Sequence, residues 1–328
     1  MAIPDFFVIG APKAGTTALH AALARHPQLY LSPVKEPKFY LCDERPPRRR
    51  EHRGPGDAHS RHEWIWRRDR YQALFDAAPA GTLRGESTPF YLADPLALAR
   101  IRTERPDARL VAVLRDPVDR AYSNWMHLWS DGLETEADVV RAVAAEDARR
   151  AAGWAPFWHY RRLGEYGRQL QALYELFPRE QVHVLRYRDL VDTPAAAVGA
   201  VCAFLGVDPG DPPVPRPENT RPFAPDTART RRLARVARAG AWAGQWFPPR
   251  AWRIAARPVL RALQSTDTPR PILTADQRVQ LLTYFEADIR LLGQVTGRDY
   301  SDWLGPAGRG AFADRRDPDL APANQPDD

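Results

Sequence analysis

Short apolar runs, separated by polar or glycine-containing segments, recur along most of this chain. The clearest are Phe6–Ile9 and Leu110–Leu114; a third strand-like run, Val182–Tyr187, is interrupted by His183 and Arg186. Continuous apolar runs of this length are typical of strands that are buried on both faces of a parallel sheet. Weaker strands are expected over 28–31 and 82–86. We therefore expect an α/β fold of three layers, in which helices flank a central parallel sheet.

Helical spacing of apolar residues fills the intervals between these runs. It predicts two helices within 134–176 and one helix from Thr274 to near Gly297. Prolines cluster over 209–225 and a basic stretch with tryptophans follows, which indicates an irregular cap or insert over about 208–271. We expect a single domain over 1–305. The tail over 306–328 is rich in proline, aspartate and alanine and is expected to be disordered.

The first apolar run ends in a loop of small residues, Gly10-Ala11-Pro12-Lys13-Ala14-Gly15-Thr16-Thr17. A strand, such a loop and a helix form an anion site, because backbone N–H groups and the positive helix end converge on a phosphate. The spacing of Gly10 and Gly15 matches the nucleotide-binding pattern G-x-x-x-x-G-K-[ST]. Thr16 takes the place of its lysine, and the lysine of this loop is Lys13. We expect a P-loop-like site; an ordinary strand-to-helix turn is the alternative.

A second pair of phosphate-binding candidates follows the run Leu110–Leu114. Arg115 ends the expected strand, Asp116 is expected to cap the next helix with Pro117 at its first position, and Ser123 lies about two turns further on. A guanidinium and a hydroxyl in these places can share one phosphate. The alternative is a local ion pair between Arg115 and Asp116, with Ser123 on the helix surface.

Carboxylates and lysines gather near the expected carboxyl ends of the second and third strands. Glu36 follows the second strand and Glu86 ends the third. Parallel strands end at one edge of a sheet, so Glu36 is expected to face the same crevice as the phosphate loop. An exposed Lys/Glu pair in a surface loop is the alternative. Of the 47 basic residues only three are lysine, all near the N-terminus: Lys13, Lys35 and Lys38.

Composition places the chain among soluble globular proteins, with 328 residues of which 44% are apolar and 27% charged. The net charge of +6 admits nucleic acid as a partner, although no binding motif is recognisable. Cys42 and Cys202 stand far apart and outside any metal-ligand spacing, so neither a disulfide framework nor a metal is expected. Without a leader or a run of 18 or more apolar residues, the chain is expected to be cytoplasmic and unanchored.

With both phosphate stretches in view, the chain resembles the sulfotransferases that use 3′-phosphoadenosine-5′-phosphosulfate (PAPS), especially the branch of heparan-sulfate and other carbohydrate enzymes. The loop Gly10–Thr17 is similar to that family's 5′-phosphosulfate loop, and Leu110–Trp125 to its 3′-phosphate motif. Further similarity lies in His26-Pro27, Lys35–Tyr40, Gly85–Pro89, Leu185–Leu190 and Gly297–Trp303.

The resemblance implies roles for particular residues. Lys13 would contact the transferring sulfuryl group and the leaving phosphate oxygen, and Glu36 would be the catalytic base. Lys38 and Glu86 are further catalytic candidates: heparan-sulfate members often carry lysine directly after the residue matching Glu86, where this chain has Ser87, and Lys38 would supply that charge. The other implied cofactor contacts are Ala14, Gly15, Thr16, Thr17, Arg115, Ser123, Tyr187 and, among several late arginines, Arg221.

We therefore expect a PAPS-dependent sulfotransferase that needs no metal and sulfates a hydroxyl, or as a second choice an amine, of a carbohydrate or small natural product. Residues 43–63, 154–160 and 222–270 are expected to shape the acceptor pocket. Two alternatives stay open. A nucleotide or small-molecule kinase would use Val111–Asp116 as a magnesium-binding strand, and a basic nucleic-acid-binding protein would bind DNA or RNA in a salt-sensitive manner.

Overall fold

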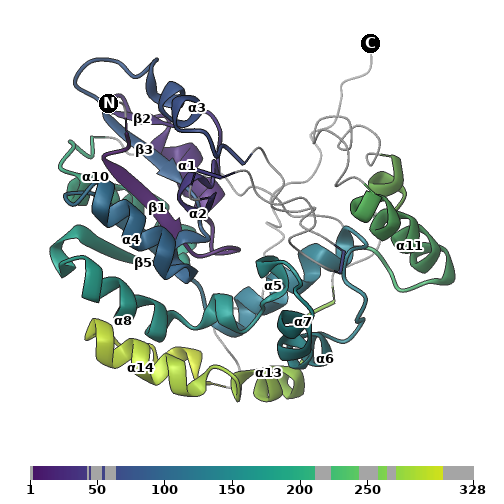
Figure 1. Cartoon of the computed structure of the whole chain (residues 1–328). Coiled ribbons are helices and arrows are strands. Elements are labelled where there is room, and N and C mark those ends of the chain that lie inside the picture. The colour runs from purple at the N-terminus through teal and green to yellow at the C-terminus, as the bar shows by residue number, and fades with distance from the viewer. Residues whose placement is uncertain are drawn as a thin grey trace, which may run out of the picture.

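Five parallel strands form one sheet in the order β2-β3-β1-β4-β5 (Figure 1). The computed structural model describes residues 3–42, 44–45, 54–55, 64–210, 223–243, 258–263 and 271–305. The strands are β1 (Phe6–Gly10), β2 (Leu29–Leu31), β3 (Leu83–Ser87), β4 (Arg109–Leu114) and β5 (Val182–Arg186). Each expected strand is present, which confirms the α/β class and the central parallel sheet.

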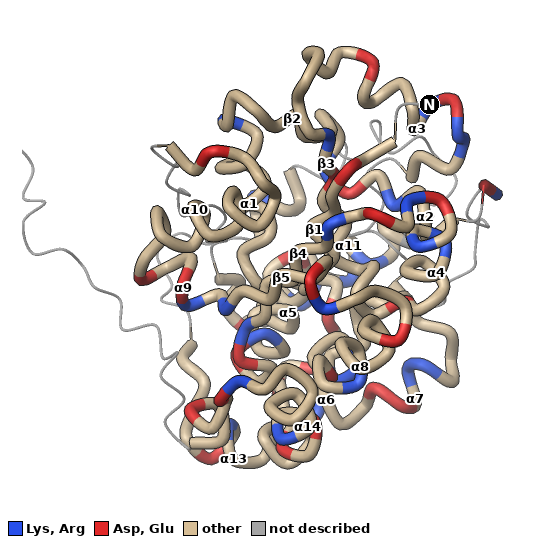
Figure 2. The backbone as a smooth tube through the Cα atoms, turned by 90° about the vertical axis from the view of Figure 1, so that its left-hand side faces the viewer, with Lys and Arg blue, Asp and Glu red and all other residues tan. Residues whose placement is uncertain are grey.

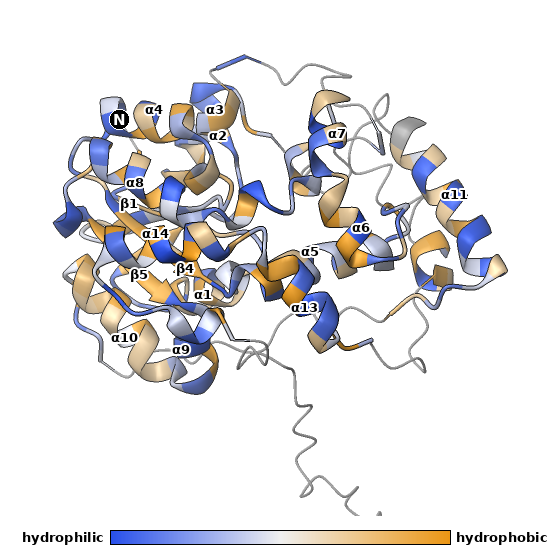
Figure 3. Ribbon diagram, turned by 90° about the horizontal axis from the view of Figure 1, so that it is seen from below, coloured by the Kyte–Doolittle hydropathy of each residue, from blue (hydrophilic) through white to orange (hydrophobic). Residues whose placement is uncertain are grey.

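The adjacent strands β1 and β4 carry the centre of the core. Every residue of β1 is buried, and so is β4 beyond Arg109. Their register places Phe6 beside Arg109 and Val8 beside Val111. Figure 3 shows the sheet as apolar and the surrounding helices as mixed in hydropathy. Burial on both faces explains why these two runs show no alternation of apolar and polar residues.

Helices surround this sheet and follow its strands in the chain. The α-helices are α1 (Thr16–Leu23), α2 (Phe39–Cys42), α3 (Arg68–Gln72), α4 (Pro95–Glu104), α5 (Pro117–Ser130), α6 (Val139–Ala144), α7 (Glu146–Ala151), α8 (Tyr166–Leu176), α9 (Tyr187–Asp192), α10 (Pro194–Leu205), α11 (Ala228–Ala243), α13 (Ala275–Leu282) and α14 (Glu286–Thr296). The 3-10 turns are η1 (Ala73–Phe75), η2 (Tyr91–Ala93), η3 (Pro156–Trp158), η4 (Arg162–Gly164), η5 (Arg179–Gln181) and η7 (Ser301–Trp303).

Both faces of the sheet are covered, which gives the three layers. The two last residues of β3 show the two sides: Glu86 bonds to Tyr71 of α3, while Ser87 bonds to His20 of α1. Successive side chains of a strand point to opposite faces, so α3 and α1 lie on opposite sides of the sheet. Helices α2, α4 and α8 join α3, and α9 and α10 join α1 (Figure 2).

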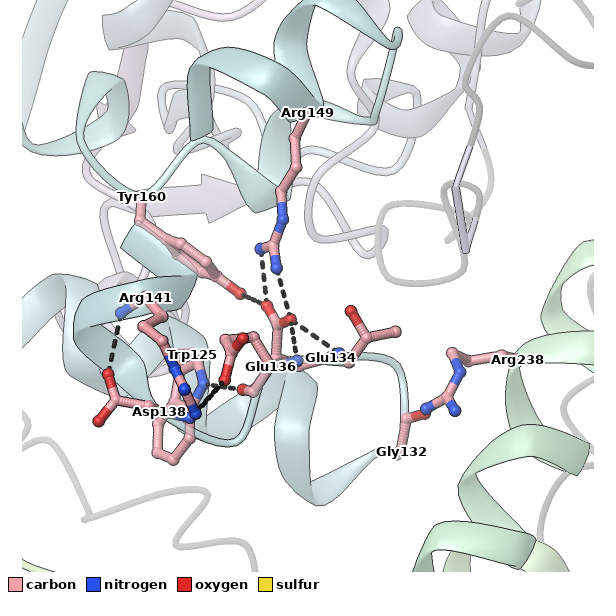
Figure 4. Close-up of polar contacts among 10 residues, drawn as sticks. Trp125, Gly132, Glu134, Glu136, Asp138, Arg141, Arg149, Tyr160 and Arg238 are labelled. Carbon is pink, nitrogen blue, oxygen red and sulfur yellow. Dashed lines mark hydrogen bonds and ion pairs between the residues drawn. The ribbon is translucent and has the colours of Figure 1, made fainter. Parts of the chain in front are cut away.

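A buried carboxylate fixes the segment that follows α5. Glu134 is 1% exposed and accepts hydrogen bonds from Arg149 at 2.7 and 2.9 Å and a further one from Tyr160 (Figure 4). The two helices expected within 134–176 are in fact three, α6, α7 and α8, with two 3-10 turns before the last. That expectation was wrong because the first of the two helices is divided at Ala145, between α6 and α7, where Arg149 of α7 bonds to the distant Glu134.

The helix expected from Thr274 to Gly297 is also divided, into α13 and α14. A capping box at Thr274 and a left-handed cap at Gly297 mark the expected ends. Between them Phe285 is fully buried, and Asp288 accepts the N–H of Gly167 at 2.8 Å in the first turn of α8. The division lets α14 pack along α8 and cap it, which a continuous helix in the direction of α13 does not do.

Helix α11, from the expected insert, lies far from the sheet and against the loop that follows α5 (Figure 1). Arg238 donates a hydrogen bond to the carbonyl of Gly132 at 2.9 Å (Figure 4). Gly132 has φ +70°, and a Cβ there would come within 3.0 Å of the backbone of Ala234. Trp129 of α5 donates to the carbonyl of Ala224 at 2.9 Å. These contacts join α11 and the segment before it to the end of α5 and the loop that follows it.

Several expectations fall outside the described residues: Arg221, the tail 306–328 and most of 43–63. The single-domain assignment of 1–305 stays a prediction. Among the described helices none is long and apolar enough to cross a membrane. Within the same residues no group of three His, Cys, Asp or Glu side chains is placed to hold a metal ion.

Candidate active site

The phosphate loop ends in a helix start that is open to an anion. Gly15 is the N-cap of α1 with φ +86°, a conformation that side chains rarely adopt. No side chain caps this end of α1, and its first turn contains no acidic residue. Thr16 is 4% exposed and Thr17 is half-buried. Backbone N–H groups at such a helix start bind phosphate.

Tyr187 closes one side of this loop. A Cβ built on Gly15 would lie 2.9 Å from Cδ2 of the Tyr187 ring, so any larger residue at position 15 would displace the tyrosine. Tyr187 begins α9, directly after β5. Ala14 is fully buried, and its N–H bonds to the carbonyl of Ala11 at 3.2 Å. The loop therefore presents the start of α1 rather than the N–H of Ala14 to a ligand.

Lys13 projects from the loop toward α5. Its backbone has φ +68°, and its Nζ lies 3.0 Å from Nδ1 of His127. Nε2 of His127 lies 3.9 Å from Oδ2 of Asp131. The sequence reasoning missed His127. The signal was available, because Ser123, His127 and Asp131 recur every four residues and so share one face of α5.

Arg115 joins the second phosphate motif to the first. Its guanidinium donates to the carbonyl of Lys13 at 3.3 Å and lies 4.9 Å from the centre of the Tyr187 ring. Asp116 caps α5 as expected, since its side chain accepts the N–H of Val118 at 2.9 Å. The same carboxylate pairs with Arg278 of α13 at 2.5 Å. Asp116 is thus engaged by the helix start and by α13.

Ser123 lies on the second turn of α5 and is half-buried. The structure thus places Arg115 at the end of β4 and Ser123 on the following helix, as the sequence indicated. Their joint role at one phosphate stays a prediction. Arg221, the late arginine that was expected to complete the site, lies outside the described residues.

Lys13 and Arg115 lie at the point of the sheet where the chain connections run to opposite sides of β1. From β1 the chain runs to β2 on one side, and from β3 it crosses over to β4 on the other side of β1. Open α/β sheets bind ligands at this point, beyond the carboxyl ends of the strands. The loop with Lys13 follows β1 and Arg115 follows β4, so the two candidate phosphate motifs lie beside each other at this point of the sheet.

The candidate base Glu36 lies in a strained turn after β2. It has φ +61°, and its N–H donates to the carbonyl of Ser87 at 3.0 Å. Its carboxylate lies 2.5 Å from Nζ of Lys35, and both side chains are about one quarter exposed. The Lys/Glu pair that was weighed as an alternative is therefore present, and it lies at the same strand edge as the phosphate loop.

Lys38 is buried, with 1% exposure and φ +59°. Its Nζ lies 5.3 Å from the centre of the Trp64 ring and 5.8 Å from that of Phe90. Phe90 packs edge-on against Phe157 at 5.9 Å, and Phe157 packs in the same way against His127 at 5.5 Å. A continuous row of rings thus joins Lys38 to the partner of Lys13.

Glu86 is fully buried, and its Oε2 accepts the hydroxyl of Tyr71 at 2.7 Å. Burial raises the pKa of Glu86 from 4.5 to about 7. Its side chain points to the face of the sheet opposite to Ser87, into a cluster of tyrosines that includes Tyr40 and Tyr91. The structure does not bring the carboxylates of Glu86 and Glu36 together, and a catalytic role for Glu86 stays a prediction.

Three comparisons with known proteins agree on one family. The sequence profile of the Sulfotransferase family matches residues 4–211. Human heparan sulfate glucosamine 3-O-sulfotransferase 3B1 is 28% identical over 206 residues, which cover 62% of this chain and 46% of the relative. Mouse bifunctional heparan sulfate N-deacetylase/N-sulfotransferase 3 is 29% identical over 214 residues, which cover 63% and 23%.

Among solved structures, the crystal structure of a sulfotransferase from Alicyclobacillus acidocaldarius superposes with a TM-score of 0.69 and 30% sequence identity. It covers 93% of this chain and 100% of that chain. By contrast, the chain spans about half the length of the curated 3-O-sulfotransferases that it matches. Because the profile match covers more than half of the chain, this protein belongs to the Sulfotransferase family.

Proposed function

We propose that this protein transfers a sulfuryl group from PAPS to a hydroxyl of a carbohydrate or of a small natural product. The observation that carries the proposal is the meeting of Lys13, Gly15, Arg115 and Tyr187 beyond the carboxyl ends of β1 and β4. Family membership supports sulfuryl transfer. The names of its relatives, heparan sulfate 3-O-sulfotransferases, support a carbohydrate acceptor.

The residues present fit the two phosphate groups of PAPS. The uncapped start of α1, with the hydroxyls of Thr16 and Thr17, suits the 5′-phosphate. Arg115, held by the carbonyl of Lys13 and the ring of Tyr187, suits the 3′-phosphate, because a guanidinium binds phosphate through two parallel hydrogen bonds. Two anion sites at neighbouring strand ends match a ligand with two separate phosphates better than one with a single polyphosphate chain.

PAPS supplies a sulfuryl group whose bond to the 5′-phosphate breaks as the acceptor oxygen bonds to sulfur. In the proposed mechanism Lys13 neutralises the charge that grows on the leaving phosphate oxygen, and Glu36 takes the proton of the acceptor hydroxyl. Lys35, 2.5 Å from Glu36, places a positive charge beside the candidate base. Electrostatics and positioning dominate such a transfer, as they do for phosphoryl groups.

The first test is calorimetric binding of adenosine 3′,5′-bisphosphate, compared with ADP and ATP, each with and without magnesium. We expect a preference for the 3′,5′-bisphosphate that does not depend on magnesium. Arg115→Ala should weaken this preference by at least about tenfold, since it removes a charge-assisted contact. Tighter binding of ATP with magnesium would instead favour the kinase alternative.

The second test is turnover of labelled PAPS against a panel of heparan-type oligosaccharides, simple sugars and phenols. Lys13→Ala and Glu36→Gln should each lower turnover by roughly 10²–10⁴-fold without unfolding the protein. Glu136→Gln, which changes a half-buried carboxylate on the loop after α5, is the matched control. Turnover near the wild-type rate in either active-site variant would remove that residue from the mechanism.

A further inference from the structure

His20 is a histidine that the proposed mechanism does not yet use. It lies on α1, one turn after Thr16, and its Nδ1 is 2.9 Å from Oγ of Ser87. Ser87 ends β3 and is fully buried. A hydrogen bond in such a place satisfies two groups that have no ready access to water. It also ties the helix of the phosphate loop to the edge of β3.

Ser87 holds the turn of the candidate base through a second atom. Its backbone carbonyl accepts the N–H of Glu36 at 3.0 Å. The next residue, Thr88, accepts the N–H of Lys38 through Oγ1 at 3.4 Å. Glu36 and Lys38 both have left-handed backbone angles, which cost free energy in residues other than glycine and persist only where neighbours hold them. The hydrogen bonds to Ser87 and Thr88, at the end of β3, hold Glu36 and Lys38 in this conformation. His20 bonds to the side chain of the same Ser87.

The imidazole of His20 feels both charges of the neighbouring pair. Burial, and after it the ammonium of Lys35, lower the pKa of His20 from 6.5 to about 4, while the carboxylate of Glu36 acts in the opposite direction. The groups that face it are thus Lys35 and Glu36 from the turn after β2 and Ser87 from β3. Near neutral pH the ring is uncharged, so Lys35 supplies the positive charge beside Glu36.

We propose that the His20–Ser87 pair is an uncharged positioning unit that fixes the turn of Glu36 relative to the phosphate loop. The proposal rests on the proposed function, in which Glu36 is the base. His20 touches neither substrate nor the reacting atoms in this scheme. It acts through Ser87, and its neutrality leaves the charge balance of the Lys35–Glu36 pair unchanged.

The test compares His20→Asn, His20→Leu and Ser87→Ala. Asparagine places a polar atom where Nδ1 stands and can keep the bond to Ser87, whereas leucine cannot. With water as the acceptor, so that no acceptor need be known, PAPS turnover should fall about tenfold in His20→Leu and Ser87→Ala and stay within about twofold in His20→Asn. Calorimetric affinity for adenosine 3′,5′-bisphosphate should stay within about twofold in all three.

Equal losses in His20→Asn and His20→Leu, no loss in His20→Leu, or a parallel loss of bisphosphate affinity would each overturn the proposal. An NMR titration that measures the pKa of the His20 ring tests the proposal independently of turnover. Lys35→Gln should raise the pKa of His20 and Glu36→Gln should lower it; a ring that responds to neither does not sense the pair. If the wild type binds no bisphosphate, the proposed function fails, while the titration still shows whether His20 and Glu36 are coupled.

Discussion

At the scale of single residues, three of the four candidate catalytic groups are held by the backbone in an unusual conformation. The described residues with positive φ other than glycine are Lys13, Glu36, Lys38 and Glu44. Three of them, Lys13, Glu36 and Lys38, were catalytic candidates from the sequence and its resemblance to the sulfotransferases. Left-handed backbone costs roughly 1–2 kcal/mol per residue outside glycine. Lys13, Glu36 and Lys38 lie in the two loops that follow β1 and β2 at the carboxyl edge of the sheet. This clustering of strained residues supports a functional reason for those loops.

One prediction at this scale concerns Glu86 and pH. The pKa of Glu86 is raised from 4.5 to about 7, so the folded chain favours its protonated form. As the pH rises through this window, the unfolded chain loses the proton first and the free energy of unfolding falls, by up to roughly 3 kcal/mol. Below about pH 4.5 both states are protonated, and above about pH 7 the loss is complete.

Glu86→Gln removes this titration. The difference in free energy of unfolding between wild type and Glu86→Gln, measured in urea from about pH 5 to about pH 8, should therefore shift in favour of the variant as the pH rises. Other buried carboxylates, such as Asp119 and Asp288, titrate in both proteins and cancel in the difference. A difference that stays constant with pH would show that Glu86 is ionised in the folded chain throughout.

At the scale of elements, the sequence predicted well which strands and helices exist and in what order. It predicted poorly where a helix is divided. All five strands were predicted, three of them from the apolar runs, and Asp116 and Thr274 marked helix starts correctly, because these signals are local. The divided helices at 134–176 and 274–297 were missed, since each break is stabilised by distant partners. Glu134 with Arg149 is one such case, and Asp288 with Gly167 is the other.

The same reason applies to the site. Residue type and strand position pointed to Lys13, Glu36 and Arg115, yet nothing local predicts that His127 meets Lys13 or that Lys38 is buried among rings. Those pairings depend on how α5 and the loop after β2 pack at the strand edge. The spacing alone could have shown only that Ser123 and His127 lie on the same face of a helix.

The carboxylate that fixes the segment after α5 allows a prediction with an internal control. Glu134 and Arg149 are both buried, so Glu134→Ala leaves the guanidinium without its partner and should lower the free energy of unfolding by about 3–5 kcal/mol. Glu136 lies two residues away and pairs with the exposed Arg141 (Figure 4). Glu136→Ala should cost less than about 1 kcal/mol. Urea unfolding of both variants checks this, and similar losses would show that the buried network is not what stabilises the segment.

At the scale of the whole molecule, Arg278 joins the late helix α13 to the start of α5, which follows the central strand β4. From α13 it pairs with Asp116 at 2.5 Å and with Asp119 at 3.1 Å, both in the first turn of α5, and it donates to the carbonyl of Trp303 at 3.1 Å. Burial and the nearby Asp116 raise the pKa of Asp119 to about 6. Arg278 therefore neutralises two carboxylates directly beside the candidate phosphate ligand Arg115.

Arg278→Met should lower the free energy of unfolding by about 3–5 kcal/mol, because it leaves two buried carboxylates side by side. Adding Asp119→Asn to that variant should restore part of the loss, as expected for directly coupled residues. Arg290→Met is the control, since Arg290 and Glu286 form an exposed pair on α14 and the change should cost less than about 1 kcal/mol. Denaturant unfolding measures all three, and additive effects of the changes at 278 and 119 would contradict the coupling.

The position of β1 in the sheet also has a consequence for how the chain is made. β1 leaves the ribosome well before the strands that it pairs with, because its sheet partners are Gly85–Ser87 on one side and Arg109–Ala112 on the other. Until those residues are synthesised, the run Phe6-Phe7-Val8-Ile9 has no strand to pair with, and unpaired apolar strands are the segments from which nascent chains aggregate. We therefore expect the yield of folded protein in a cell to depend on the rate of translation and on chaperones that shield this segment until its partners have been made.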